Sequence, residues 1–211
     1  MKVLFTMLLM LSSAVAFADA YGPARSELEK FSNGLETLQV DFTQVVKSQD
    51  GSIQDKTYGN AWLQSPDKLR WVYAGDFPEI IVADGLDVWI YDEALEQVTI
   101  KPQSNQVADT PLLILTDISQ LDKEFLVAEL GDFEDMFLLE LRSRDEESQF
   151  ERILIGMDAS GIRMMIMEDA FGQRTEIHFS NIVRNADLAA DVFSFTPPEG
   201  TDVVGQATTT E

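Results

Sequence analysis

The chain has 211 residues, no cysteine, one histidine and a formal net charge of −22. This length suits one domain with a sizeable core. The missing cysteines exclude disulfide bonds and thiol chemistry, and the excess of acidic residues disfavours binding to nucleic acid or anionic lipid. Solubility or a saline habitat is the simplest explanation of the acidity. The alternative is that it keeps a protein with an apolar interior off membranes.

Residues 1–18 have the features of a secretory signal peptide. Lys2 supplies the positive start, an apolar run follows that only Thr6 interrupts, and residues 16–18 read Ala-Phe-Ala, a typical cleavage site. The run is shorter than the roughly 20 residues that span a bilayer. We therefore expect cleavage after Ala18, or two residues later after Ala20. The mature chain is then exported, to the periplasm in a host with two membranes, and we expect no stable membrane insertion.

A helix is expected next, over residues 23–35. Leu28, Phe31 and Leu35 fall on one face of a 3.6-residue period, Pro23 suits a first turn and Gly34 an end. A half-buried strand follows, in which Leu38, Val40 and Phe42 alternate with polar residues. Further strands of the first half are predicted at residues 53–63, 69–73, 79–83, 88–91 and 97–101.

The second half is also mostly strands. A polar loop (103–110) and a helical turn (112–115) precede strands at residues 125–130, 136–143, 151–157, 162–168 and 175–182, a brief helix at 187–191 and a disordered tail at 205–211. Many short strands with few helices indicate a barrel or a sandwich. We expect one domain over residues 19–204.

No catalytic constellation is apparent. His178 stands alone in a strand, which is more often structural than catalytic. Zinc sites and cysteine or serine triads have little support, and no phosphate-binding glycine motif occurs. Acidic residues are many but scattered, so nothing selects a pair for glycoside chemistry. We therefore predict neither an enzyme nor a metal or cofactor site.

Apolar strand faces remain the main candidate for function. Alternation places Trp71, Tyr73, Trp89 and Tyr91 on one face of their strands, opposite Val72 and Ile90, without showing which face is interior. Methionines are flexible and suit variable apolar ligands. An ordinary β core is the simplest explanation, whereas a curled sheet with helices over its mouth would form a ligand cavity. The cavity candidates are Phe42, Trp62, Trp71, Tyr73, Trp89, Tyr91, Met165 and Met167.

An ordered series of short motifs resembles the LolA family of periplasmic lipoprotein carriers. The motifs are Phe42-Thr43-Gln44, Gly59 with Trp62, Pro66 with Arg70-Trp71-Val72-Tyr73, Asp84-Gly85 with Val88-Trp89-Ile90-Tyr91-Asp92, Glu96-Gln97, Thr110-Pro111, Asp169 with Gln173, and Phe193-Ser194-Phe195-Thr196-Pro197-Pro198-Glu199-Gly200. No single motif is specific, but together they span nearly the whole mature chain.

The resemblance implies an incomplete antiparallel β-barrel with a helical lid over an apolar cavity. It implies a monomeric carrier that takes triacylated lipoproteins from an inner-membrane ABC transporter and passes them to an outer-membrane receptor. No cofactor is implied, and a partner supplies the energy. Lid candidates are Leu28, Phe31, Leu35, Leu112, Leu113 and Leu115. The alternatives are a lipid- or lipoprotein-sensing module of the same fold and a periplasmic hydrolase.

One position departs from the family pattern. Some members carry an arginine before the proline matched by Pro66, and that arginine holds the lid closed by hydrogen bonds. Here the position is Ser65. The resemblance therefore implies either a weaker latch or a replacement by Arg70 or Lys68.

Overall fold

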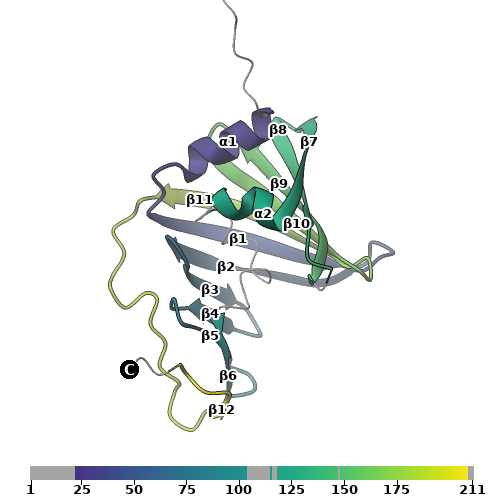
Figure 1. The fold of residues 1–211 in the computed structure, drawn as a ribbon. Helices are drawn as coiled ribbons and strands as arrows, with labels where there is room; N and C mark the ends of the chain where they lie inside the picture. The colour runs from purple at the N-terminus through teal and green to yellow at the C-terminus, as the bar shows by residue number, and fades with distance from the viewer. Residues whose placement is uncertain (1–21, 104–114, 116–117, 147, 209–211) are drawn as a thin grey trace, which may run out of the picture.

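A computed structural model describes residues 22–103, 115, 118–146 and 148–208. The described residues form a curled sheet of twelve strands with a helix lying across its concave side (Figure 1). The strands of the first half are β1 (Thr37–Lys47), β2 (Ile53–Gln64), β3 (Lys68–Ala74), β4 (Glu79–Ala83), β5 (Asp87–Asp92) and β6 (Gln97–Pro102). Those of the second half are β7 (Phe125–Phe133), β8 (Met136–Ser143), β9 (Phe150–Asp158), β10 (Gly161–Asp169), β11 (Arg174–Arg184) and β12 (Asp202–Val204).

The long strand β1 joins the two halves of the sheet. It pairs antiparallel with β2 on one side and with β11 on the other. The full order is β12-β6-β5-β4-β3-β2-β1-β11-β10-β9-β8-β7, so β12 and β7 form two open edges. Among the residues that the structure describes, hydrogen bonds do not close the sheet, and the expected incomplete antiparallel barrel is confirmed. The pairing of β12 with β6 is parallel.

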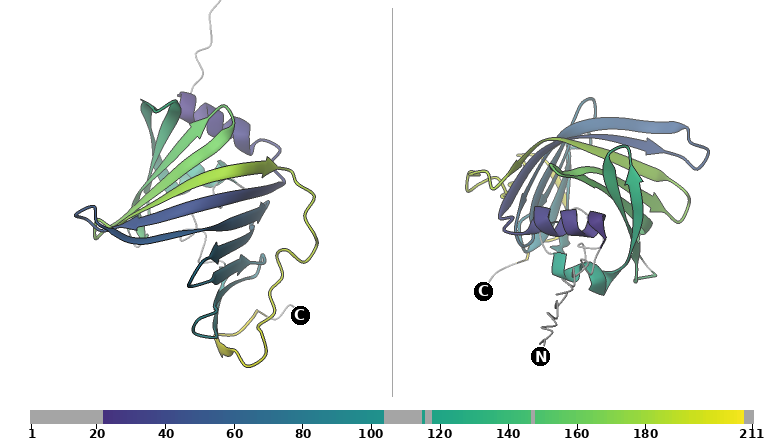
Figure 2. Two further views of the ribbon diagram at one scale, coloured as in Figure 1. Left: turned by 180° about the vertical axis from the view of Figure 1, so that it is seen from behind. Right: turned by 90° about the horizontal axis from the view of Figure 1, so that it is seen from above.

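The first helix, α1 (Pro23–Ser32), fills the concave side of the second half. It contacts β7, β8, β9 and β10, and Figure 2 shows it crossing their inner face. Leu28 and Phe31 are buried there, as their helical spacing predicts. A short 3-10 helix, η4 (Ile118–Gln120), leads into α2 (Leu121–Glu124), whose Leu121 is fully buried.

The segment after β11 runs along the convex side of the first half (Figure 2). There the ring of Phe195 lies 6.1 Å from that of Trp89 and 5.7 Å from that of Tyr91. Thr208 donates hydrogen bonds of 2.7 Å from its backbone N–H and its hydroxyl to the carboxylate of Asp87. A residue of the expected disordered tail therefore has defined partners.

The expected strands are present, and those at 79–83 and 136–143 have the predicted bounds. The brief helix expected at 187–191 is wrong, because this segment runs as turns and irregular chain along the sheet. Residues 104–110 of the predicted polar loop (103–110) and residues 112–114 of the helical turn lie outside the described residues, as does the predicted signal peptide. None of the helices in the described ranges is long and apolar enough to span a membrane.

Candidate functional site: an apolar concave face beneath two helices

Three aromatic side chains form the centre of the concave face in the first half. Phe42 on β1 lies opposite Gly59 on β2, and Gly59 lies opposite Tyr73 on β3. The ring of Phe42 is 4.1 Å from that of Trp71 and 5.4 Å from that of Tyr73. Gly59 permits this packing, because a Cβ there would lie 1.8 Å from the carbonyl oxygen of Val72 and 2.9 Å from the Phe42 ring. The three rings are thus one contiguous apolar surface.

Aliphatic and methionine side chains continue this surface across the second half. Met165 and Met167 on β10 are buried and belong to the same hydrophobic cluster as Phe42 and Trp71. The other buried members of this cluster on β7 to β11 are Phe125, Leu139, Leu141, Ile153, Ile155, Met157, Ile162, Ile177 and Phe179. The concave face therefore offers an unbroken apolar lining, in which methionine supplies adaptable shape.

The apolar face of α1 closes this lining from above. Ala24, Leu28 and Phe31 are buried in the same cluster, as are Leu121 of α2 and Leu115. A helix that covers the lining through side-chain packing, without belonging to the sheet, can move without breaking strand hydrogen bonds. In this arrangement α1 covers the concave side of β7 to β10.

A charged contact fixes the start of α1 to α2. The guanidinium of Arg25 donates to both carboxylate oxygens of Asp122, at 2.6 and 2.7 Å, and its Nε donates to Glu29 at 3.1 Å. The Arg25 side chain is only 10% exposed, whereas that of Asp122 is 59% exposed. The hydrogen bonds from Arg25 lower the pKa of the Asp122 carboxyl, and those to Asp122 raise the pKa of Arg25.

Strand β7 holds the same end of the helix. The Glu129 carboxylate accepts hydrogen bonds from the backbone N–H groups of Ala24 and Arg25, at 3.0 and 2.9 Å. These donors belong to the first turn, where backbone N–H groups lack partners within the helix and the helix dipole favours an anion. We call Arg25, Asp122 and Glu129 the clasp, because together they bind the start of α1 to α2 and to the edge strand.

Polar groups border the aromatic centre on its side away from α1. The Tyr73 hydroxyl donates to Gln44 at 3.3 Å, and burial raises its pKa to about 12. Glu79 lies opposite Tyr73, and Asp92 lies opposite Glu79. Burial first, and then the charge of Asp92, raise the pKa of Glu79. The lining thus changes from apolar to acidic along β3, β4 and β5.

The predicted cavity residues fall on two different faces. Phe42, Trp71, Tyr73, Met165 and Met167 belong to the concave cluster or pack against it. The register excludes Trp62, Trp89 and Tyr91 from this face, so the expectation that the four aromatics of β3 and β5 share a face is wrong. Trp71 lies opposite Ile81, and Ile81 opposite Ile90, so Ile90 rather than Trp89 shares its face.

The predicted lid residues are only partly described. Leu28, Phe31, Leu35 and Leu115 are buried in the concave cluster, whereas Leu112 and Leu113 lie outside the described residues.

Of the suggested latch residues, Lys68 and Arg70 lie on the face of the sheet opposite α1. Arg70 Nη1 donates to the carbonyl oxygen of Val192 at 3.3 Å, in the C-terminal segment. Lys68 and Arg70 alternate with Leu69 and Trp71, which places them on the convex side. Ser65 donates its backbone N–H to the carbonyl of Glu36.

Sequence reasoning missed the clasp. Its one local signal is the spacing of Arg25 and Glu29, four residues apart on a helix.

Comparison with known proteins identifies the family. The sequence matches the family described as outer membrane lipoprotein carrier protein LolA over residues 33–196. The chain belongs to the LolA family. An outer-membrane lipoprotein carrier protein of Xanthomonas campestris pv. campestris is 38% identical over 93% of this chain and 95% of its own length. One from Dechloromonas aromatica is 35% identical over 89% of this chain and 90% of its own length.

A solved structure supports the fold of this LolA protein. An uncharacterized conserved protein from Thermus thermophilus matches with a TM-score of 0.53 and 14% identity, over 86% of this chain and 96% of that one. At this identity the likeness concerns the fold alone.

Proposed function

We propose that this chain is a periplasmic carrier that shields the acyl chains of lipoproteins against its concave face, beneath α1 and α2. The continuous apolar lining from Phe42 to Met167 is the observation that carries the proposal. The relatives named as outer-membrane lipoprotein carrier proteins support it and favour a carrier over an enzyme or a sensor. The charged start and apolar run of residues 1–18 support export by a cleaved signal peptide.

The energetics of acyl burial fit a movable helix. Each buried methylene group contributes about 0.8 kcal/mol, so one long acyl chain contributes roughly 10 kcal/mol. Release of the lipoprotein would be slow if all of this binding free energy were retained. Lifting α1 exposes Leu28 and Phe31 and breaks the clasp, and these costs offset part of the gain. Cargo binding is then strong enough for transport through water and weak enough for transfer.

The partners follow from the same role. The cargo is a triacylated lipoprotein, the donor an inner-membrane lipoprotein-releasing ABC transporter and the acceptor an outer-membrane receptor. The chain carries no motif for nucleotide binding, so the donor supplies the energy of loading.

Depletion of this protein in its host tests the proposal. Lipoproteins destined for the outer membrane should then accumulate in the inner membrane, as membrane fractionation measures. Protein isolated from the periplasm should also carry a triacylated polypeptide, detectable by native mass spectrometry. Normal lipoprotein distribution after depletion, with no acylated species bound, would contradict the proposal.

A further inference from the structure

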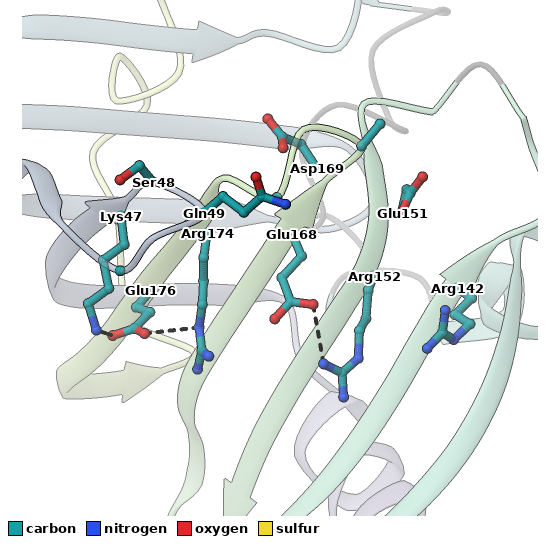
Figure 3. Close-up of a pocket in the computed structure, with 13 residues that line it drawn as sticks. Lys47, Ser48, Gln49, Arg142, Glu151, Arg152, Glu168, Asp169, Arg174 and Glu176 are labelled. Atoms are coloured by element: carbon teal, nitrogen blue, oxygen red, sulfur yellow. Dashed lines mark hydrogen bonds and ion pairs between the residues drawn. The ribbon is translucent and has the colours of Figure 1, made fainter.

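The convex face carries a groove of about 760 Å³ where two hairpin tips meet the second half of the sheet (Figure 3). Basic residues from four strands line it: Lys47, Arg142, Arg152 and Arg174. An equal number of acidic residues lines it: Glu151, Glu168, Asp169 and Glu176. Glu140, a buried acid outside the lining, pairs with both Arg142 and Arg152. On a chain of net charge −22, the groove is therefore close to charge balance, with one carboxylate in excess.

Its charges alternate in sign across neighbouring strands. Lys47 Nζ lies 2.8 Å from one Glu176 oxygen, and Arg174 Nε lies 2.9 Å from the other. Arg152 Nη1 lies 3.2 Å from a Glu168 oxygen. Each cation has several N–H groups and each carboxylate several lone pairs, so paired side chains keep capacity for a further ligand. The groove can therefore bind an anionic and a cationic group close together.

Large apolar side chains project at the rim of this groove. Phe171 stands between Ala170 and Gly172, which line the groove, and is 86% exposed. Ile53, on the neighbouring hairpin, is 64% exposed. The two tips touch, because a Cβ on Gly172 would lie 2.9 Å from the side chain of Gln49. Exposed apolar side chains beside a polar groove are typical of an interaction site.

A phospholipid surface has groups that complement both the charged groove and the exposed apolar side chains at its rim. Its phosphate suits the arginines, a headgroup ammonium suits the carboxylates, and its interfacial region accepts an aromatic side chain. The strong negative charge elsewhere on the chain would repel an anionic bilayer. We propose that the groove and the Phe171 and Ile53 tips form a weak docking site for zwitterionic phospholipid bilayers.

The chain supplies a matched control residue. Phe77, in the turn between β3 and β4, is 79% exposed, close to the exposure of Phe171. Asp76 precedes it and Glu79 follows two positions later, and it does not line the groove. An exposed phenylalanine without the balanced groove should not promote docking.

Flotation of the mature protein with vesicles of phosphatidylcholine and phosphatidylethanolamine tests the site. The wild type and Phe77→Asp should co-float to the same extent, whereas Phe171→Asp should reduce the partition coefficient about tenfold, the effect of losing one partly buried phenylalanine. Arg142→Gln should cause a smaller reduction, because it removes one cation from the groove and leaves Glu140 paired with Arg152 alone. Added phosphatidylglycerol should weaken binding. In buffer without vesicles, Phe171→Asp should bind a fluorescent fatty acid like the wild type, which separates this site from the concave face.

Several results would overturn the proposal. Equal flotation of the wild type and Phe171→Asp, or an equal loss in Phe77→Asp, excludes the tip as the docking element. Binding that rises with phosphatidylglycerol excludes a zwitterionic target. A Phe171-dependent complex with a periplasmic or membrane protein domain, without vesicle binding, assigns the surface to a protein partner instead.

Discussion

The guanidinium of Arg25 donates two hydrogen bonds, of 2.6 and 2.7 Å, to the carboxylate of Asp122, across 97 residues of sequence. This pair joins the helix that covers the concave face to the short helix at the open sheet edge. A bidentate pair of this kind fixes orientation as well as distance. It therefore positions α1 over the apolar lining more specifically than hydrophobic packing would.

Loss of the clasp should favour an open state, in which α1 is lifted from the concave face. Arg25→Gln removes a charge-assisted bidentate contact. Because Asp122 is largely exposed, we expect roughly a tenfold increase in the rate of hydrogen exchange of the α1 amides, and no more. Lys30→Gln is the matched control, since Lys30 pairs with Glu27 within the helix at an exposed site. Equal protection of α1 in both variants would show that packing alone holds the helix.

The raised pKa of Glu79 makes a prediction about pH. Burial and Asp92 disfavour its charged form, so this group contributes stability below its ordinary pKa of 4.5 that is lost as the pH rises through the folded value. Glu79→Gln should therefore raise the melting temperature by about 1–3 °C at pH 7. The difference should vanish near pH 4, as calorimetry at both pH values can measure. A destabilised variant at pH 7 would contradict this assignment.

Tryptophan fluorescence distinguishes the two faces of the sheet. A variant that retains only Trp71, with Trp62 and Trp89 replaced by phenylalanine, should be strongly quenched by a brominated fatty acid. A variant that retains only Trp89 should be quenched little, because Trp89 lies against Phe195 on the convex side. Stronger quenching of Trp89 than of Trp71 would place the acyl chain on the convex face and contradict the proposed site.

Two strand glycines should respond differently to the same substitution. Gly59→Ala places a methyl group against the backbone carbonyl of Val72, which cannot move without disturbing β3, and we expect a loss of about 3 kcal/mol. Gly156→Ala meets mainly the flexible side chains of Met136 and Met164, at 3.2 Å and beyond, and should cost about 1 kcal/mol or less. Urea denaturation measures both. Similar losses would show that β2 and β3 can separate locally.

Sequence patterns predicted which residues form strands better than they predicted on which face of the sheet each side chain lies. The period of two in Leu38, Val40 and Phe42 identifies a buried side within one strand. The relation between strands depends on the register of each hairpin, and a one-residue shift reverses the face. Odd-numbered Trp71 shares its face with odd-numbered Ile81 but with even-numbered Ile90. Sequence alternation within a strand contains no information about that change, so it predicts a shared face for Trp71 and Trp89 that the register contradicts.

The clasp could not be predicted from the sequence either, because it too depends on how distant segments are placed in space. Arg25, Asp122 and Glu129 are distant in sequence and come together only when α1 crosses the curled sheet. The latch at Ser65 or Arg70, by contrast, followed from resemblance alone. Arg70 instead bonds to the C-terminal segment.

A reversible tether on α1 tests the central claim most directly. The chain has no cysteine, so Arg25→Cys with Asp122→Cys introduces one reactive pair across the clasp. The double variant should bind a fluorescent fatty acid freely, lose binding when joined by a disulfide-containing bismaleimide, and regain it on reduction. The single variants treated with the same reagent should bind throughout. Undiminished binding by the fully joined protein would contradict the claim that acyl chains enter beneath α1.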